Sequence, residues 1–171
     1  RDVDIWDFLS LGLGEPMGVS ALHSRNTGDL LDSIVSSLPA INFDNETTKE
    51  IMANPIEEEI PGVAIVGRPN VGKSTLFNRL IGDERSVVHD MPGTTRDAID
   101  TVVETELGPL RFIDTAGMRR KARVDDDTEY YSNLRALRAI DKADVALLVI
   151  DSSEGVTSQD QRLAERVDAA G

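Results

Sequence analysis

The sequence contains no cysteine and is poor in aromatic residues, which make up 4% of its 171 positions. Without cysteine, the chain can form no disulfide framework, no cysteine-ligated zinc site and no thiol nucleophile. No apolar run approaches the ~18 residues that a membrane-spanning helix needs, so no membrane partner is expected. Because 40% of the residues are hydrophobic, we still expect a core, formed mainly by valine, isoleucine and leucine.

Positive charge is also scarce. Lysine and arginine total 18 against 31 aspartates and glutamates, so the formal net charge is −13. This charge argues against nucleic-acid binding through bulk electrostatics, because neutralising phosphates needs clustered lysine and arginine. Residues 1–60 hold 3 basic and 12 acidic residues, a net of −9, whereas residues 61–171 hold 15 and 19, a net of −4. The chain therefore divides into a short acidic unit and a more balanced domain.

The acidic unit has two predicted helices and one short predicted strand. Apolar residues cluster at positions 5–11, which predicts a helix, and residues 17–22 are typical of a short strand. Residues 28–38 have the i, i+3, i+4 apolar spacing of an amphipathic helix. Residues 39–60 are acidic and interrupted by proline, which predicts a solvated linker.

From residue 61 onward, strands and helices alternate in the predicted pattern. Residues 63–66 and 145–150 are almost wholly apolar, as is typical of strands inside a parallel sheet. The order β-α-β-β-α-β-α predicts an α/β fold, a three-layer sandwich with a mostly parallel sheet. The remaining predictions are strands at 98–107 and 110–113, a turn at Gly108-Pro109 between them, and helices at 73–81, 128–140 and 158–170.

The most specific motif follows the first of these strands. Residues 67–74 read Gly-Arg-Pro-Asn-Val-Gly-Lys-Ser and match the phosphate-binding pattern G-x-x-x-x-G-K-[ST]. The glycines let backbone N–H groups surround phosphate oxygens, and the following helix offers its positive N-terminus. Lys73 would reach the β- and γ-phosphates of a nucleotide, and the Ser74 hydroxyl would bind Mg²⁺.

Two further segments bear on the choice between ATP and GTP. Residues 92–97, Pro-Gly-Thr-Thr-Arg-Asp, lie in a polar loop, where a threonine can bind Mg²⁺ and sense the γ-phosphate. Residues 114–117, Asp-Thr-Ala-Gly, directly follow a predicted strand. The aspartate can hold Mg²⁺ through water, and the glycine N–H can meet the γ-phosphate. Three such segments in this order are far more specific than any one of them.

Together these motifs resemble those of the translation-factor-related P-loop GTPases, and within that group the Era and Der (EngA) type. The matching stretches are residues 67–75, 92–97 and 114–117, and Met118-Arg119-Arg120-Lys121 is similar to Der in particular. The resemblance covers nearly all of residues 61–171. It implies the P-loop GTPase fold, hydrolysis of GTP to GDP, a bacterial-type cytoplasmic location and a switch function in large ribosomal subunit assembly, with ribosomal RNA as a partner.

The resemblance also implies which residues form the site. Mg²⁺ ligands are expected at Ser74, Thr95 (or Thr94) and Asp114, and catalytic roles at Lys73, Thr95, Gly117 and Asn70. Nucleotide contacts are expected from Arg68, Pro69, Asn70, Val71, Gly72, Lys73, Ser74, Thr75, Asp114, Thr115, Ala116 and Gly117.

The residue after Asp-Thr-Ala-Gly departs from the common GTPase pattern. Met118 stands where many GTPases carry a water-orienting glutamine, and a thioether cannot polarise water. Related GTPases with an apolar residue here use a potassium ion coordinated by the asparagine of Gly-x-Pro-Asn, which is Asn70 in this sequence. Asn70 is therefore a candidate potassium ligand, and the alternative is a side chain that only stabilises the loop.

The first residues extend the resemblance. Val19-Ser20-Ala21-Leu22 followed by Gly28-Asp29-Leu30-Leu31 is similar to the last guanine-binding loop and last helix of a GTPase domain. Der proteins carry two such domains in tandem, joined by an acidic linker and followed by a KH-like domain. We therefore expect the end of a first G domain at 1–38, the linker at 39–60 and the N-terminal two-thirds of a second G domain at 61–171. Intramolecular contacts with the first G domain and the KH-like domain are also implied.

The guanine-specifying motif Asn-Lys-x-Asp is missing from both units. Asp141-Lys142-Ala143-Asp144 imitates it but precedes the predicted strand at 145–150, so we interpret it as a turn between a helix and a strand. We expect the true motif just beyond Gly171, and we expect these residues alone not to bind guanine nucleotide tightly.

Two alternatives stay open. One is a circularly permuted ribosome-assembly GTPase, in which a Ser-Ala loop also precedes the phosphate loop. The other is a nucleotide-dependent binding module with negligible turnover, which fits the missing glutamine.

Overall fold

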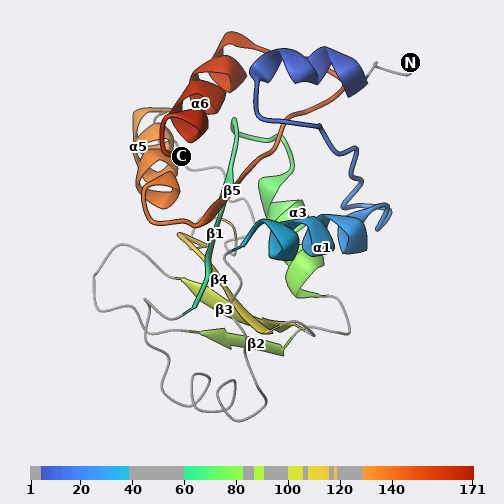
Figure 1. Ribbon diagram of the computed structural model, residues 1–171, viewed down its shortest axis with the longest axis vertical. Helices are drawn as coiled ribbons and strands as arrows, with labels where there is room; N and C mark the ends of the chain where they lie inside the picture. The colour runs from blue at the N-terminus through green and yellow to red at the C-terminus, as the bar shows by residue number, and fades with distance from the viewer. Residues whose placement is uncertain are drawn as a thin grey trace.

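The computed structural model describes residues 5–38, 60–82, 87–90, 100–105, 108–115, 118 and 129–171 (Figure 1). The predicted linker lies outside the described residues except for Ile60. In chain order the elements are the 3₁₀ helix η1 (Ile5–Leu11), α1 (Thr27–Ser37), β1 (Gly62–Val66), α3 (Lys73–Ile81), β2 (Val87–Asp90), β3 (Thr101–Thr105), β4 (Gly108–Phe112), α5 (Glu129–Ile140), β5 (Val145–Leu148) and α6 (Ser158–Asp168).

The five strands form one sheet in the order β2-β3-β4-β1-β5. β1 lies between β4 and β5 and is parallel to both. β3 is antiparallel to its two neighbours, β2 and β4. Four of these strands therefore run in the same direction and β3 runs against them, which agrees with the prediction of a mostly parallel sheet.

The side chains of β1 alternate between two cores, one on each face of the sheet. Val63 and Ile65 share a core with residues of α1 and α3. Ala64 and Val66 share the other core with Ala139 and further residues of α5. A strand covered by helices on both faces must be apolar throughout, as this one is. Figure 1 shows α1 and α3 on one side of the sheet and α5 and α6 on the other, so the three-layer prediction is confirmed.

Two aromatic rings lie at the centre of the larger core. Phe77 of α3 and Phe112 of β4 are almost fully buried, and their ring centroids are 5.6 Å apart with an interplanar angle of 70°. This is the edge-to-face geometry that aromatic pairs favour. Ile34 of α1 is buried in the same core. The helix of the acidic unit thus packs on the sheet, and the expected division of the chain at residues 38 and 60 stays a prediction.

The predicted strand at residues 17–22 is wrong, because the structure has one isolated bridge there. Ser20 and Arg25 exchange two backbone hydrogen bonds of 3.1 and 3.0 Å. Asn26 has a left-handed φ of 58°, and its side-chain Nδ2 donates to the Gly18 carbonyl at 2.8 Å. The segment therefore forms its hydrogen bonds within itself and does not join the sheet.

The predicted turn at Gly108-Pro109 is also wrong, because both residues belong to β4. Gly108 pairs with Thr105, and Pro109 pairs with Glu104. The fixed φ of proline is compatible with extended backbone near the start of a strand, so the dipeptide does not force a turn. The pattern does not predict β2 at all, because Val87–Asp90 offers only two adjacent apolar residues.

The prediction that residues 141–144 form a turn between a helix and a strand is confirmed. They lie between the end of α5 and the start of β5. Asp144 closes this turn onto β1, because its Oδ2 accepts from the Gly62 N–H at 2.7 Å and its own N–H donates to the Gly62 carbonyl at 2.8 Å. The aspartate has a structural task here.

Replacing Asp144 with alanine is expected to lower the free energy of unfolding by about 1.5–3 kcal/mol, because the Gly62 N–H loses a charged acceptor. Asp141→Ala is the matched control in the same turn. Its carboxylate pairs with Arg166 at 3.4 Å on the surface, and exposed pairs of this kind contribute little. Urea unfolding of both variants measures the difference. Equal losses in the two variants would contradict the assigned task of Asp144.

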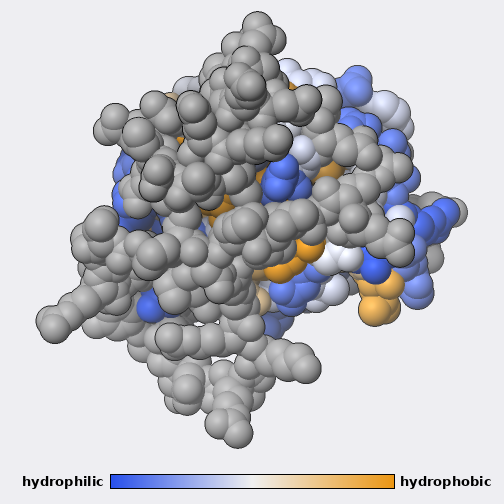
Figure 2. Space-filling view, turned by 90° about the horizontal axis from the view of Figure 1, so that it is seen from below, coloured by the Kyte–Doolittle hydropathy of each residue, from blue (hydrophilic) through white to orange (hydrophobic). Residues whose placement is uncertain are grey.

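On the face seen in Figure 2, the described residues that are visible include both hydrophobic and hydrophilic ones. No helix within the described residues combines the length and the apolar character that crossing a bilayer requires.

Candidate nucleotide-binding site

The predicted phosphate loop, residues 67–74, connects the carboxyl end of β1 to α3. Its first residue, Gly67, packs closely against the segment after β5. A Cβ atom at Gly67 would lie 2.4 Å from the Val149 carbonyl oxygen, well inside van der Waals contact. Only glycine therefore lets the loop leave the sheet at this point.

The middle of the loop has left-handed backbone at two positions. Asn70 has a φ of 64°, and Gly72 has a φ of 101°. Asparagine and glycine are the residues that adopt this region most readily. Gly72 is the N-cap of α3, and no side chain caps the helix. The first N–H groups of α3 are therefore available to an anion, with the positive end of the helix dipole behind them.

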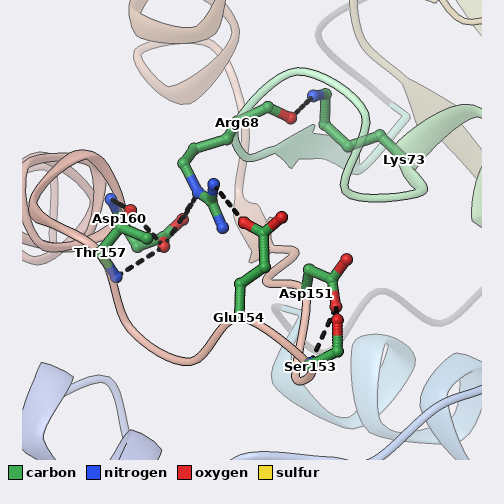
Figure 3. Close-up of polar contacts among 7 residues, drawn as sticks. All are labelled: Arg68, Lys73, Asp151, Ser153, Glu154, Thr157 and Asp160. Atoms are coloured by element: carbon green, nitrogen blue, oxygen red, sulfur yellow. Dashed lines mark hydrogen bonds and ion pairs between the residues drawn. The ribbon is translucent and has the colours of Figure 1, made fainter.

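Lys73 folds its ammonium group back over the loop. Its Nζ donates to the carbonyl oxygens of Gly67 and Arg68, at 2.8 Å for the former, as Figure 3 shows for Arg68. Burial lowers the pKa of Lys73 from 10.5 to about 8. Burial disfavours the charged form of Lys73, and a nearby negative charge favours it. A bound anion would therefore stabilise the Lys73 ammonium.

Arg68 points away from the centre of the loop. Its Nε donates to both carboxylate oxygens of Asp160 in α6, at 3.0 and 3.1 Å, and its Nη1 donates to Glu154 at 2.9 Å. Figure 3 shows the guanidinium lying between these two carboxylates. The pKa of Arg68 is raised, first by the Glu154 hydrogen bond and also by Asp160, against the effect of burial. The Arg68 side chain is therefore engaged by Asp160 and Glu154 and is not turned into the loop, contrary to the expected nucleotide contact through this side chain.

Of the two further predicted segments, residues 92–97 lie outside the described residues, and the other begins at Asp114, after the end of β4. Because β4 runs parallel to β1, this segment and the phosphate loop leave the same edge of the sheet. Asp114 has a left-handed φ of 52°, which costs free energy in a residue other than glycine. Its N–H donates to Asp100 Oδ1 at 2.9 Å, and Arg111 Nη1 donates to Asp100 Oδ2 at 3.0 Å. Asp100 therefore holds Asp114 in this conformation.

The Asp114 carboxylate suits a hard cation. One of its oxygens, Oδ1, is buried and has no hydrogen-bond partner within the described residues. Burial raises the pKa of Asp114, opposed by Arg135 and reinforced by Asp100. A bound cation would give the unpartnered oxygen a partner and would offset the cost of burying the carboxylate charge. Mg²⁺ is such a cation, since it prefers carboxylate and hydroxyl oxygens. Ser74 in the first turn of α3 is exposed and offers such a hydroxyl. Within the described residues, no three histidines, aspartates or glutamates gather into a metal cluster.

The remaining predicted residues have different outcomes. Pro69, Val71 and Thr75 lie in the loop or in the first turn of α3, as expected. Thr95, Ala116 and Gly117 lie outside the described residues.

Thr115 and Met118, which follow Asp114 in the chain, have side chains that are buried inside the protein. The buried hydroxyls of Thr115 and Thr101 share a hydrogen bond of 2.6 Å, which ties β3 to the segment after β4. Met118 is buried in the core that contains Phe77, so its side chain packs inside the protein.

Sequence reasoning misses Asp160 and Asp100. Thr157-x-x-Asp160 is the pattern of a helix capping box, and the structure contains that capping box at the start of α6. This signal locates the start of a helix, but it does not reveal the partnership with Arg68. Nothing in the local pattern around Asp100 marks its bond to Asp114.

The site combines a phosphate-loop sequence with a buried carboxylate oxygen that suits a hard cation, and comparison with known proteins decides the family of the chain. The family described as "50S ribosome-binding GTPase" matches residues 62–170. The chain belongs to this GTPase family.

The predicted resemblance to the Der type is confirmed by the relatives of the chain. The chain is 51% identical over 166 residues to the protein named "GTPase Der" of Heliobacterium modesticaldum, covering 97% of this chain and 35% of the relative. It is 49% identical to the GTPase Der of Desulforudis audaxviator, over 100% of this chain and 36% of the relative. The match to that of Moorella thermoacetica is 53% over 92% of this chain and 34% of the relative. The chain spans about a third of the length of these curated relatives.

Proposed function

We propose that the polypeptide containing these residues binds GTP with Mg²⁺, hydrolyses it to GDP and phosphate, and acts as a nucleotide switch in large ribosomal subunit assembly. The observation that carries this proposal is the phosphate loop, residues 67–74, placed beside Asp114 at one edge of the sheet. Membership of a family described as 50S ribosome-binding GTPase supports both the nucleotide and the ribosomal partner. Ribosomal RNA as the contacted surface rests on the resemblance alone.

Attack by water on the γ-phosphate needs charge neutralisation and positioning. Lys73 contributes a positive charge within the loop, and the free N–H groups at the start of α3 contribute directed donors. Bound Mg²⁺ would neutralise phosphate charge, held by Ser74 and Asp114 and, by resemblance, Thr95. The backbone N–H of Gly117 is a further proposed donor to the γ-phosphate.

Orientation of the attacking water needs another source than Met118, whose side chain is in the core. We propose that Asn70 holds a potassium ion next to the phosphates, which adds positive charge where it develops. Its support is the exposed position of Asn70 at the tip of the loop. The left-handed backbone of Asn70 equally suits the alternative role of stabilising the loop.

Phosphate release from GTP is expected to be faster in potassium than in sodium by about tenfold or more, because the cation contributes to transition-state stabilisation. The assay uses the longest natural polypeptide that contains residues 1–171, with ATP in parallel to test base preference. Asn70→Ala is expected to remove the potassium effect. Asn78→Ala, at an exposed position of α3, is the matched control and should keep it.

Each result of this assay has a separate meaning. If the polypeptide binds GTP tightly but does not hydrolyse it, the result would support a nucleotide-dependent binding module and contradict the enzyme. Equal rates in the two salts would contradict the potassium role alone. No binding of GTP would contradict the proposed function.

One observation, the packing of α1, fits the circularly permuted alternative, although the match to GTPase Der over 97–100% of this chain argues against it. α1, which precedes the phosphate loop in the chain, packs in the core of the sheet through Ile34. A permuted domain would place its last helix there. An Asn-Lys-x-Asp motif found only before residue 1 in the natural polypeptide would support permutation, and one on each side would support tandem domains.

A further inference from the structure

The phosphate loop is joined to α6 through one buried ion pair. Asp160 is 0% exposed and the Arg68 side chain 14% exposed. Buried pairs of this kind are sensitive to the loss of either partner, because the remaining charge is left unpaired. The pair Arg166–Asp141, which also involves α6, differs sharply, because its side chains are 48% and 56% exposed.

Asp160 also builds the start of α6. Its Oδ2 accepts from the N–H and the hydroxyl of Thr157, at 3.0 and 2.7 Å, and its own N–H donates to Thr157 Oγ1 at 3.4 Å. The same carboxylate thus caps the helix and receives Arg68. A shift of Arg68 would change the hydrogen bonds of the N-terminal turn of α6, because Arg68 and Thr157 both donate to the Asp160 carboxylate.

The segment from β5 to α6 is attached by the same guanidinium. Glu154 in this segment accepts from Arg68 and is itself 58% exposed. Asp151 and Ser153 form a local turn, in which the Ser153 N–H and hydroxyl donate to Asp151 Oδ1 at 2.8 and 2.6 Å. Figure 3 shows Arg68 joined to Glu154 and to Asp160 at the start of α6, with the separate Asp151–Ser153 turn just before Glu154 in the chain.

We propose that Arg68 is a positioning residue, which holds the phosphate loop in its binding conformation by anchoring it to Asp160 and so couples nucleotide binding to the start of α6. The inference rests on the proposed function. Arg68 acts through Asp160 and does not itself contact the phosphates. A loop already held in place loses less conformational freedom when nucleotide binds. By thermodynamic reciprocity, bound nucleotide stabilises the N-terminal turn of α6 to the same extent.

The coupling is measured by nucleotide affinity and by amide hydrogen exchange in the longest natural polypeptide that contains residues 1–171. Arg68→Ala is expected to weaken Mg-GTP binding by about tenfold, since it removes charge-assisted hydrogen bonds. In the unaltered protein, GTP is expected to slow exchange at the Asp160 and Gln161 amides. Arg68→Ala should remove that slowing, and Arg68→Lys should restore part of it.

A double-variant cycle separates positioning from direct contact. Asp160→Asn keeps an acceptor for Thr157 and loses the charge that receives Arg68, so it is expected to weaken binding by a similar factor. Because both residues act through one link, the double variant Arg68→Ala/Asp160→Asn should be no weaker than either alone by more than about twofold. Arg166→Ala removes an arginine from the exposed pair on the same helix and is the matched control, which should leave both readouts unchanged.

Three outcomes overturn the inference in distinguishable ways. If the unaltered protein binds no GTP, the proposed function fails and the inference fails with it. If GTP binds and Arg68→Ala changes neither affinity nor exchange at α6, the inference alone fails. If the losses in the double variant are additive, Arg68 acts independently of Asp160 and is not a positioning residue.

Discussion

Replacing Lys73 with alanine is expected to weaken Mg-GTP binding by about 10²- to 10⁴-fold, because two charge-assisted hydrogen bonds to phosphate are lost at about 1.5–3 kcal/mol each. The ammonium already lies over the loop, held by the carbonyls of Gly67 and Arg68. It therefore needs little movement to meet a phosphate. Equilibrium titration with a fluorescent GTP analogue measures the loss.

Two controls make the Lys73 result specific. Arg79→Ala removes a positive charge from the exposed last turn of the same helix and should leave affinity within about twofold. Lys73→Ala should not reduce the stability of the nucleotide-free protein, since burial already disfavours the ammonium and lowers its pKa to about 8. A variant that retains affinity within tenfold would contradict the phosphate role of Lys73.

Replacing Phe77 with alanine is expected to lower the free energy of unfolding by about 3–5 kcal/mol, the usual cost of deleting a buried aromatic ring. Phe77 is fully buried and meets Phe112 edge to face. Since domains of this size are stable by only about 5–15 kcal/mol, the variant should be partly unfolded at moderate temperature. Urea unfolding followed by circular dichroism measures the change.

The Phe77 prediction has a graded control. Phe77→Leu keeps most of the volume and should cost less than half as much, because the cavity is smaller. Leu134→Ala, at an exposed position of α5, should cost well under 1 kcal/mol. A loss at Phe77 no larger than that at Leu134 would contradict the assignment of the larger core.

Much of the fold follows from local pattern. β1 and β5 are apolar runs, and α3 begins at Lys73 and ends at Ile81 as its spacing predicts. β2 is missed because two valines next to polar residues are a weak signal whose strand conformation depends on pairing with β3. The turn at Gly108-Pro109 is misplaced because the pairing with β3, and not the preference of the dipeptide, decides the conformation.

In the candidate site, too, the local features are predictable from sequence and the long-range contacts are not. The phosphate loop is predictable because its residues are contiguous and each has a local task. The partnership of Arg68 with Asp160 joins residues 92 positions apart, so no local pattern encodes it. Asp100 is similar, since its bond to the Asp114 N–H depends on the alignment of β3 with β4. Contacts of this kind follow from topology, which a single sequence does not provide.

The place of β1 between two distant partners has a consequence for synthesis on the ribosome. Gly62 at its start bonds to Asp144, 82 positions later in the chain, and its strand pairs run on to Leu148. β3 and β4, by contrast, can pair as soon as both have emerged, because they are neighbours in the chain. Non-local pairing is slow to form. The apolar β1 therefore stays without its second partner until residues 145–148 have been made, and during that interval its unpaired edge is exposed to aggregation.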